Sequence, residues 1–191
     1  MSTNEVPIKR CLHHVLIEIP KNVSVKIDGK MVIMQGPKGV ISRDFSKCPV
    51  QIEFVNNKHI IIKAINYKKF SKANVETVAA HIKNMIRGVT KGFKYILKIV
   101  YSHFPITVEV KEDLREVWIK SFKGEKGIRK AKIFGSDVSV SVSGDEIIIT
   151  GINIENVGQT AANICQTARI KGLDPRVFQD GIYLYSKGEI S

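Results

Sequence analysis

The chain has 191 residues, of which 43% are hydrophobic and 25% are charged, so it can build a packed core and is not a disordered tail. Its 30 lysines and arginines exceed its 18 acidic residues, and the resulting net charge of +12 favours a polyanionic partner. No apolar run approaches the roughly 20 residues of a membrane span, and the polar start does not resemble a signal peptide, so we expect a soluble intracellular protein.

The first half of the chain predicts short strands followed by a helix. Alternating apolar residues indicate strands at 23–27 and 31–34, and Gly36-Pro37-Lys38-Gly39 reads as a plain turn. Residues 51–63 predict a hairpin with Asn56 and Asn57 in its turn. A helix is predicted from about Lys72 to Arg87, with Gly88 ending it. Its apolar positions at helical spacing are Val75, Val78, Ala79, Ile82, Met85 and Ile86.

The second half repeats this order. Strands are predicted at 106–110 and 117–119, and a hairpin at 138–150 turns at Ser143-Gly144-Asp145. A helix is predicted from about Asn156 to Lys171, stopped by Gly172, with Val157, Ala161, Ile164, Cys165 and Ala168 facing inward. Pro20 and Pro105 are 85 positions apart, and so are Gly39 and Gly124. A shared offset indicates an internal duplication.

The duplication predicts an α+β fold made of two tandem copies of a small domain, each an antiparallel-rich sheet covered by one helix. The expected domains are residues 1–89 and 90–191. Residues 173–191 show no clear period, and Asp174-Pro175 and Asp180-Gly181 read as turns. We expect the second domain to end in a C-terminal tail that binds RNA.

Basic residues gather in the second domain with only Glu125 opposing them, and Gly124 and Gly127 leave room for phosphates to approach. The cluster comprises Lys120, Lys123, Lys126, Arg129, Lys130 and Lys132. A solvated charged face is the alternative for these residues alone, and the charge of the whole chain favours RNA.

The tail interleaves basic and aromatic side chains, which can hold phosphates and stack on unpaired bases. These residues are Arg169, Lys171, Arg176, Phe178, Tyr183, Tyr185 and Lys187. The alternative is that the aromatic rings dock the tail on its own domain, and we expect both roles, divided residue by residue.

Nothing in the sequence predicts a catalytic site, a metal site or a cofactor. Cys11, Cys48 and Cys165 are widely separated and form no Cys-x-x-Cys pair. His81 and His103 are expected to be partly buried structural residues. No nucleophile motif, phosphate-binding loop or carboxylate pair stands out, which argues against a small-molecule substrate.

The sequence resembles the large-subunit ribosomal proteins numbered six in bacterial and nine in eukaryotic naming, in their eukaryotic and archaeal branch. The resemblance covers nearly the whole chain, and its most specific part is a Phe-x-Asp-Gly-aliphatic-Tyr pattern at Phe178 to Tyr183, preceded by Gln166 and followed by Lys187. Further matching segments are 32–45, 84–93, 100–106 and 124–126. Leu173 stands where the family has a basic residue, and the link at 67–74 lacks the family's tryptophan-rich basic loop.

The resemblance implies a structural constituent of the large ribosomal subunit that binds rRNA near the stalk base and the sarcin-ricin loop, chiefly through the second domain and tail. It implies neighbouring ribosomal proteins as partners, translational GTPases nearby and a cytoplasmic location, with assembly in the nucleolus if the source is eukaryotic. Two alternatives remain, a free-standing RNA-binding protein or chaperone and a small enzyme with a basic cleft. The enzyme would need a convergent polar site, and the sequence offers none.

Overall fold

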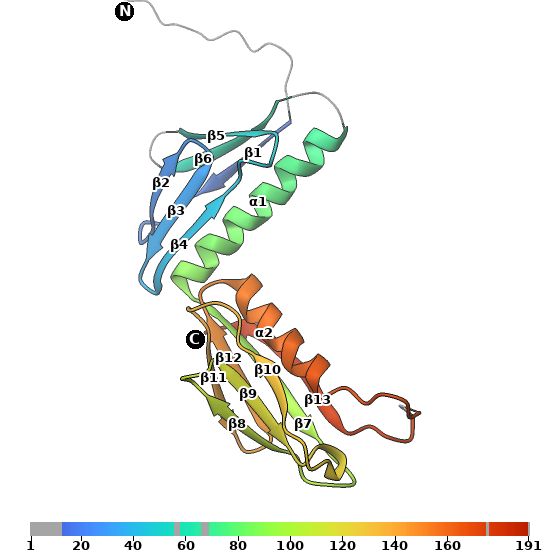
Figure 1. The fold of residues 1–191 in the computed structure, drawn as a ribbon. Coiled ribbons are helices and arrows are strands. Elements are labelled where there is room, and N and C mark those ends of the chain that lie inside the picture. The colour runs from blue at the N-terminus through green and yellow to red at the C-terminus, as the bar shows by residue number, and fades with distance from the viewer. Residues whose placement is uncertain (1–12, 56–57, 66–68, 175, 191) are drawn as a thin grey trace, which may run out of the picture. The chain divides into compact units, whose positions relative to one another are not determined.

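The computed structural model describes residues 13–55, 58–65, 69–174 and 176–190. The predicted turn residues Asn56 and Asn57, as well as Cys11 and Pro175, lie outside this range. The chain divides into two compact units, Met1–Thr90 and Lys91–Ser191. Each unit contains antiparallel sheets and one long helix (Figure 1).

Unit 1 contains two three-stranded antiparallel sheets and helix α1 (Lys69–Thr90), which runs along both of them (Figure 1). One sheet has the order β1 (His14–Glu18), β6 (His59–Ala64), β5 (Val50–Val55). The other has the order β2 (Ser24–Asp28), β3 (Met31–Gly36), β4 (Gly39–Asp44). The hairpin predicted at 51–63 is confirmed as the β5–β6 pair.

The core of unit 1 follows from the two periodicities in its sequence. Alternate residues of β3 and β6 are buried, and all six predicted inward positions of α1 are buried as well. A helix with one apolar stripe therefore covers sheets with one apolar face.

Helix α1 continues past Gly88, so the predicted stop at that residue is wrong. Gly88 is buried inside the helix, and the Thr90 hydroxyl donates to the carbonyl oxygens of Ile86 and Arg87 in the last turn. The Lys38 N–H, in the confirmed turn between β3 and β4, donates to the Val89 carbonyl at 3.0 Å. These hydrogen bonds satisfy carbonyls that a helix end leaves without partners.

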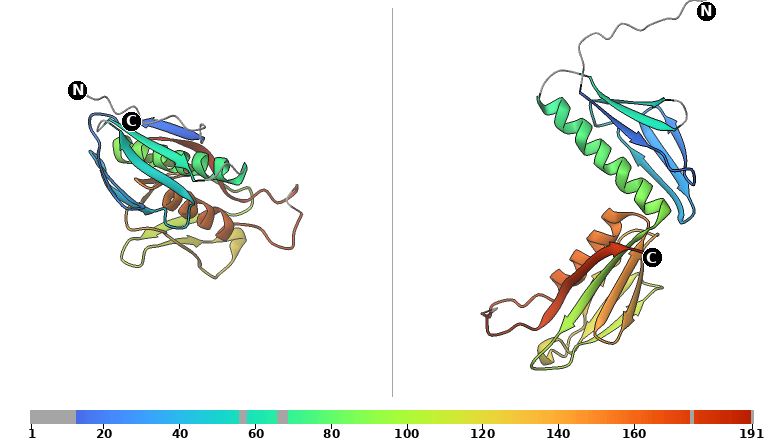
Figure 2. Two further views of the ribbon diagram at one scale, coloured as in Figure 1. Left: turned by 90° about the horizontal axis from the view of Figure 1, so that it is seen from above. Right: turned by 180° about the vertical axis from the view of Figure 1, so that it is seen from behind.

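Unit 2 contains a four-stranded sheet, a three-stranded sheet and helix α2 (Ile154–Thr167), visible from two further sides in Figure 2. The larger sheet has the order β11 (Ser139–Ser143), β12 (Glu146–Gly151), β7 (Phe93–Val100), β13 (Gly181–Glu189). The smaller has the order β10 (Arg129–Lys132), β9 (Glu116–Lys120), β8 (Thr107–Lys111), with a short 3-10 turn, η1 (Phe122–Gly124), after β9. Both sheets and α2 enclose a single apolar core.

The hairpin predicted at 138–150 is confirmed as β11–β12, but α2 differs from its predicted bounds at both ends. It begins at Ile154 because the Asn153 side chain accepts a hydrogen bond from the Glu155 N–H at 3.0 Å. It ends at Thr167, five residues before Gly172. Four of its five predicted inward residues are buried, and Cys165 is half-buried.

The tail contains a regular strand, although its sequence shows no clear period. Residues 181–189 form β13, which pairs antiparallel with β7 along its whole length. Ile182 is 2% exposed and belongs to the core. A β-bulge between Leu184 and Ser186 breaks the alternation of apolar and polar residues, so the sequence shows no strand period there.

The predicted α+β class with two tandem sheet domains is confirmed, although each unit has two sheets where one was expected. The sequence marks strands but not their pairing, which joins distant segments such as β7 and β13. In the described part of the chain, no helix is long and apolar enough to cross a membrane.

Candidate RNA-binding surface

A basic groove of about 830 Å³ lies where β10 runs beside the end of α2. It brings together five predicted RNA-binding residues from two distant segments, and among the described residues no Asp or Glu lines it. The lining residues are Arg129, Lys130, Ala131, Lys132, Asn163, Gln166, Thr167, Arg169 and Lys171.

The local folding of β10 explains how its charges reach this groove. Ala131 is 2% exposed and packs into the core, so the neighbouring Lys130 and Lys132 side chains point the other way, into solvent. The Asn163 amide donates to the Lys132 carbonyl at 3.0 Å and ties α2 to the strand. Arg169 and Lys171 follow the helix end, where a helix dipole favours positive charge.

Arg129 differs from its neighbours because its guanidinium is occupied within the protein. It forms two hydrogen bonds with Glu125, at 2.6 and 2.9 Å, and lies over the Phe122 ring at 4.1 Å. It also donates to the carbonyls of Thr167 and Arg169 at 3.0 and 3.1 Å, which caps the end of α2. Arg129 therefore supports the groove more than it offers a free charge to it.

Two other lysines of the cluster meet acids that the local sequence does not reveal. Lys120 lies 2.6 Å from the Glu109 carboxylate, and Lys130 lies 4.0 Å from that of Glu116, both on adjacent strands. The hydrogen bond from Lys120 lowers the pKa of Glu109 below its ordinary value. Glu125 is consequently not the only acid opposing the cluster.

A second group, the loop cluster, consists of Lys123, Phe178, His103 and Asp180. The Lys123 ammonium lies 4.6 Å from the centre of the Phe178 ring, and His103 packs against the same ring at 5.1 Å. Ser121 and Lys123 have the left-handed φ angles of 57° and 54° that turn η1 toward Phe178. Phe178 is therefore half-buried, and part of its ring surface is already in contact with protein.

Asp180 is the buried member of the loop cluster and holds residues 102 and 103 in place through hydrogen bonds. Its side chain accepts hydrogen bonds from the Ser102 and His103 N–H groups at 2.7 and 3.2 Å and contacts His103 Nδ1 at 2.7 Å. Burial opposes its ionisation, but these hydrogen bonds outweigh burial and lower the pKa of Asp180 to about 2. Ser102 Oγ contacts the same ring nitrogen as Asp180, whereas a catalytic triad needs opposite nitrogens.

The other predicted RNA-binding residues are spread over unit 2. Exposed Lys126 and the half-exposed Phe104 line a separate hollow of about 620 Å³ beside Gly124 and Gly127. Arg176 is exposed, and the Tyr183 hydroxyl donates to the Gln179 carbonyl at 3.1 Å while its side chain stays 51% exposed. Lys187 lies over the Tyr95 ring at 5.6 Å and does not line the basic groove.

Sequence patterns missed Asn163, Thr167, His103 and Phe104 as parts of these surfaces. His103 was assigned only a structural role, and its contact with Asp180 supports that role. Asn163 and Thr167 are four residues apart on α2 and therefore share a face, a signal that becomes useful only once β10 is known to lie beside that face.

In the described ranges, the remaining histidine, cysteine and acidic side chains form no further cluster that could hold a metal ion. Cys48 and Cys165 are both free and half-buried, and no three His, Cys, Asp or Glu side chains of this part of the chain could hold a metal ion together.

Comparison with known proteins gives a consistent result. A family model described as Ribosomal protein L6 matches the chain twice, over residues 19–92 and 93–181. The large ribosomal subunit protein uL6 of Staphylothermus marinus is 54% identical over 173 residues, which are 91% of this chain and 94% of that protein. Proteins of the same name from Desulfurococcus amylolyticus and Methanobrevibacter smithii are 50% and 52% identical, over 91% and 90% of this chain and 94% of each relative.

Proposed function

Because the chain belongs to the ribosomal protein L6 family, we propose that it is a structural constituent of the large ribosomal subunit that binds rRNA mainly through unit 2. Members of this family are structural ribosomal components, so the chain is not an enzyme. The relatives carry the large subunit in their names, and the similarity extends over nine-tenths of this chain.

The basic groove is the observation that supports RNA binding most strongly. Lys132, Arg169 and Lys171 are exposed, and in the described part of the chain no acidic side chain lies within ion-pair distance of them. Three unneutralised cations along one groove suit a run of phosphates, because displacing counterions from RNA drives binding. Lys130 reaches the same groove while lying over the Trp118 ring at 4.9 Å.

The loop cluster and the nearby Tyr183 supply a different chemistry for the same ligand. Exposed Tyr183 and the partly covered Phe178 offer ring surfaces, and Lys123 offers charge at the Phe178 ring. Single-stranded or looped RNA is recognised through such stacking. We assign phosphate binding to the basic groove and base contacts to Tyr183, with Phe178 chiefly holding Lys123 in place.

The resemblance to the family supports a finer proposal on location. The rRNA contacts would lie near the stalk base and the sarcin-ricin loop, with translational GTPases docking nearby and other large-subunit proteins alongside. The protein would act on the cytoplasmic ribosome. The prediction of nucleolar assembly applied only to a eukaryotic source, and the archaeal relatives give it no support.

A free-standing RNA-binding protein or RNA chaperone is the alternative function, because it would use the same basic groove. The two differ in how firmly they stay on the ribosome. A structural constituent should sediment with large subunits on a sucrose gradient in high salt, whereas a chaperone should be released.

A salt titration tests the assignment of the groove. Replacing Lys132 and Lys171 with Ala should lower the slope of log affinity against log salt by roughly two, because each lysine neutralises about one phosphate. The measurement is binding of the full chain to one rRNA fragment, and the fold of each variant is checked by circular dichroism.

The matched control is Lys26→Ala with Lys83→Ala, two exposed lysines on β2 and α1 of unit 1. These changes remove the same charge and should leave the slope within about half a unit of the parent. Equal slopes for both double variants would show that the groove is a solvated charged face, and the proposal would be wrong.

A further inference from the structure

The hollow beside Gly124 and Gly127 has a chemistry that differs from that of the basic groove. It lies between the segment before β8, the end of β9 and the loop that leads into β10. The hollow and the groove have no described lining residue in common. The lining residues that decide its chemistry are Phe104, Lys120, Glu125, Lys126, Gly127 and Ile128.

Phe104 gives the hollow an aromatic wall that is open to solvent. Its side chain is 51% exposed, and that of Ile128 in the same hollow is 43% exposed. The Phe104 ring lies against the backbone of Gly124, because a Cβ at that position would be only 3.3 Å from the ring. Gly124 has a φ of 75°, a left-handed conformation that favours glycine. The loop therefore supports the ring while half of the side chain stays exposed.

The charges around the hollow leave one cation without a partner. Lys120 is paired with Glu109 at 2.6 Å, and Glu125 accepts hydrogen bonds from Arg129 at 2.6 and 2.9 Å. The hydrogen bonds from Arg129 hold the pKa of Glu125 below its ordinary value, so this carboxylate stays ionised and paired. Lys126 is exposed, and in the described part of the chain no acid lies within ion-pair distance of it.

The loop also offers backbone donors beside this lysine. Among the described residues, the N–H groups of Lys126 and Gly127 have no hydrogen-bond acceptor. Nothing lies within 4 Å of the position that a Cβ on Gly127 would occupy, so a ligand can approach the backbone closely. A lysine next to unpaired N–H groups suits a phosphate, since both kinds of donor contact phosphate oxygens.

We propose that this hollow binds one unpaired nucleotide of the large-subunit rRNA. The base stacks on the Phe104 ring beside Ile128, and its phosphate contacts the Lys126 ammonium and the N–H groups of Lys126 and Gly127. The inference deepens the proposed function and rests on it. It adds a base contact that comes from a different segment than Tyr183.

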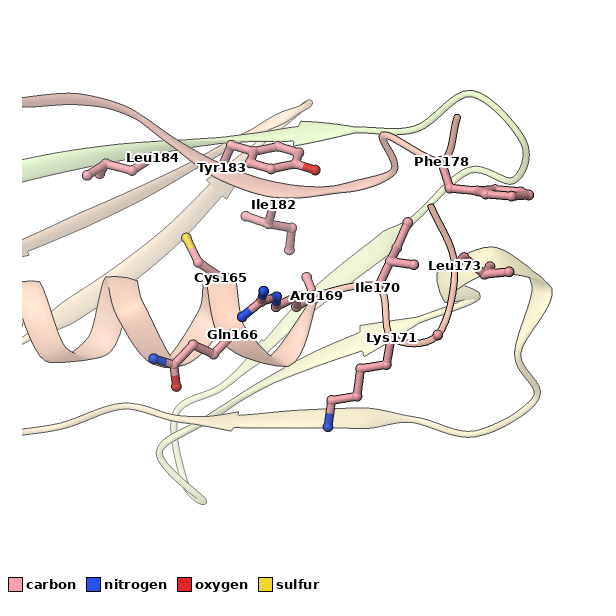
Figure 3. A pocket seen from close by; sticks show the side chains of 12 residues that line it. Cys165, Gln166, Arg169, Ile170, Lys171, Leu173, Phe178, Ile182, Tyr183 and Leu184 are labelled. Atoms are coloured by element: carbon pink, nitrogen blue, oxygen red, sulfur yellow. The ribbon is translucent and has the colours of Figure 1, made fainter. Parts of the chain in front are cut away.

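Phe104 is better placed for stacking than Phe178. Figure 3 shows Phe178 at one end of the mostly aliphatic pocket between α2 and β13, and Lys123 and His103 already contact its ring. Among the described residues, no cation and no second ring lies over Phe104.

A nucleotide also suits the hollow better than a peptide segment does. It carries a flat ring and a negative charge a short distance apart, and these match Phe104 and Lys126. An aliphatic peptide side chain could pack on Phe104, but it would use neither the Lys126 charge nor the two N–H groups.

Photo-crosslinking within assembled subunits is the first test. The photoreactive residue p-benzoylphenylalanine replaces Phe104 in the full chain, and large subunits are purified from cells in which this variant is the sole copy. Irradiation should join the chain to one nucleotide of the rRNA, and ribonuclease should shorten the adduct. The same photoreactive residue at Phe70, which is 72% exposed on α1 of unit 1, is the matched control and should not reach that nucleotide.

The second test measures binding of the full chain to an rRNA fragment that contains the crosslinked nucleotide. Phe104→Leu keeps an apolar side chain but removes the ring, so the affinity should fall about tenfold while the salt slope stays constant. Phe104→Trp keeps a stacking surface and should bind within about twofold of the parent. Lys126→Ala should lower the salt slope by about one. The matched control, Phe70→Leu, should leave both affinity and slope unchanged, and circular dichroism checks the fold of each variant.

Other outcomes overturn the proposal. An adduct between residue 104 and another ribosomal protein would show that a peptide fills the hollow, and subunits that contain the chain but yield no rRNA adduct would also contradict it. Equal losses of affinity in Phe104→Leu and Phe104→Trp would show that Phe104 only shapes the loop. Absence of the chain from the subunits would instead show that the proposed function itself is wrong.

Discussion

Arg129 belongs to the basic cluster, but its contacts lie within the protein and stabilise the fold. Its guanidinium contacts the Glu125 carboxylate, the Phe122 ring and two carbonyls at the end of α2. Planar, multidentate donors favour arginine over lysine at such a position. The neighbouring Lys132 has no comparable contact among the described residues and stays exposed.

Arg129→Ala should therefore lower the free energy of unfolding by about 2 kcal/mol, because charged hydrogen bonds are lost and two carbonyls lose a partner. Lys132→Ala removes the same charge and should change it by less than about 0.5 kcal/mol. Urea unfolding followed by circular dichroism makes the comparison. Equal effects would mean that the contacts of Arg129 add nothing to stability.

Asp180 should make the stability of unit 2 depend on acid pH. Its pKa of about 2 is below its ordinary value of 3.8, so the stabilisation is fully present above about pH 4 and is lost as the pH falls toward 2. Asp180→Asn should be less stable near neutral pH and should lack this component of the acid loss. The measurement is urea unfolding between pH 2 and 6, and parallel curves for both proteins would contradict the assignment.

Among the helices and strands, β13 differs most from the sequence prediction, because no strand was predicted at residues 181–189. The sequence shows no clear period there and was interpreted as an RNA-binding tail, yet Ile182 is buried against β7 and the core. The residues on β13 that we propose to contact RNA, Tyr183 and Lys187, therefore lie on a strand that the domain needs for its own stability.

Ile182→Ala should accordingly cost about 2–4 kcal/mol of unfolding free energy, as large-to-small changes in a core do. Tyr185→Ala, three residues along the same strand at 69% exposure, is the control and should cost less than about 1 kcal/mol. Thermal unfolding of both variants distinguishes them. A mild effect at Ile182 would indicate that β13 is only loosely attached.

Sequence periodicity predicted the elements whose pattern is local. Both hairpins and both amphipathic helices were predicted because their apolar spacing lies within one short segment. Helix ends were less accurate, since hydrogen bonds such as Lys38 to Val89 come from elsewhere in the chain. β13 was missed because its bulge disrupts the strand period.

The site was predicted in composition but not in arrangement. The sequence identified the basic residues of β10 and of the segment after α2, and the structure places five of them in one groove. It could not show that Glu109 and Glu116 face Lys120 and Lys130, because strand pairing brings these residues together. Nor could it separate Arg129, with its internal contacts, from its exposed neighbours.

Taken as a whole, the chain carries two similar units with different surfaces. The basic groove and the loop cluster both belong to unit 2, and the boundary at Thr90 and Lys91 leaves each unit with its own sheets and helix. We therefore propose that each unit is an independent domain, close to the predicted division into residues 1–89 and 90–191.

A fragment of residues 91–191 should fold cooperatively and bind the rRNA fragment within about threefold of the intact chain, because it keeps both surfaces. The fragment of residues 1–90 should fold but bind weakly. Circular dichroism melting and salt-matched binding assays test both statements. Tight binding by the first fragment would move the RNA contact to unit 1.

The pairing of β7 with β13 also sets an order of events during synthesis. β7 is the first strand of unit 2 to leave the peptide exit tunnel, and one of its two neighbours in the sheet is translated some 80 residues later. Unit 1 has all its strands once α1 has emerged at Thr90, so it can fold while unit 2 is still incomplete. The newborn chain thus carries an unpaired apolar strand edge for the last part of its translation, and that interval is when it most needs a chaperone or prompt assembly.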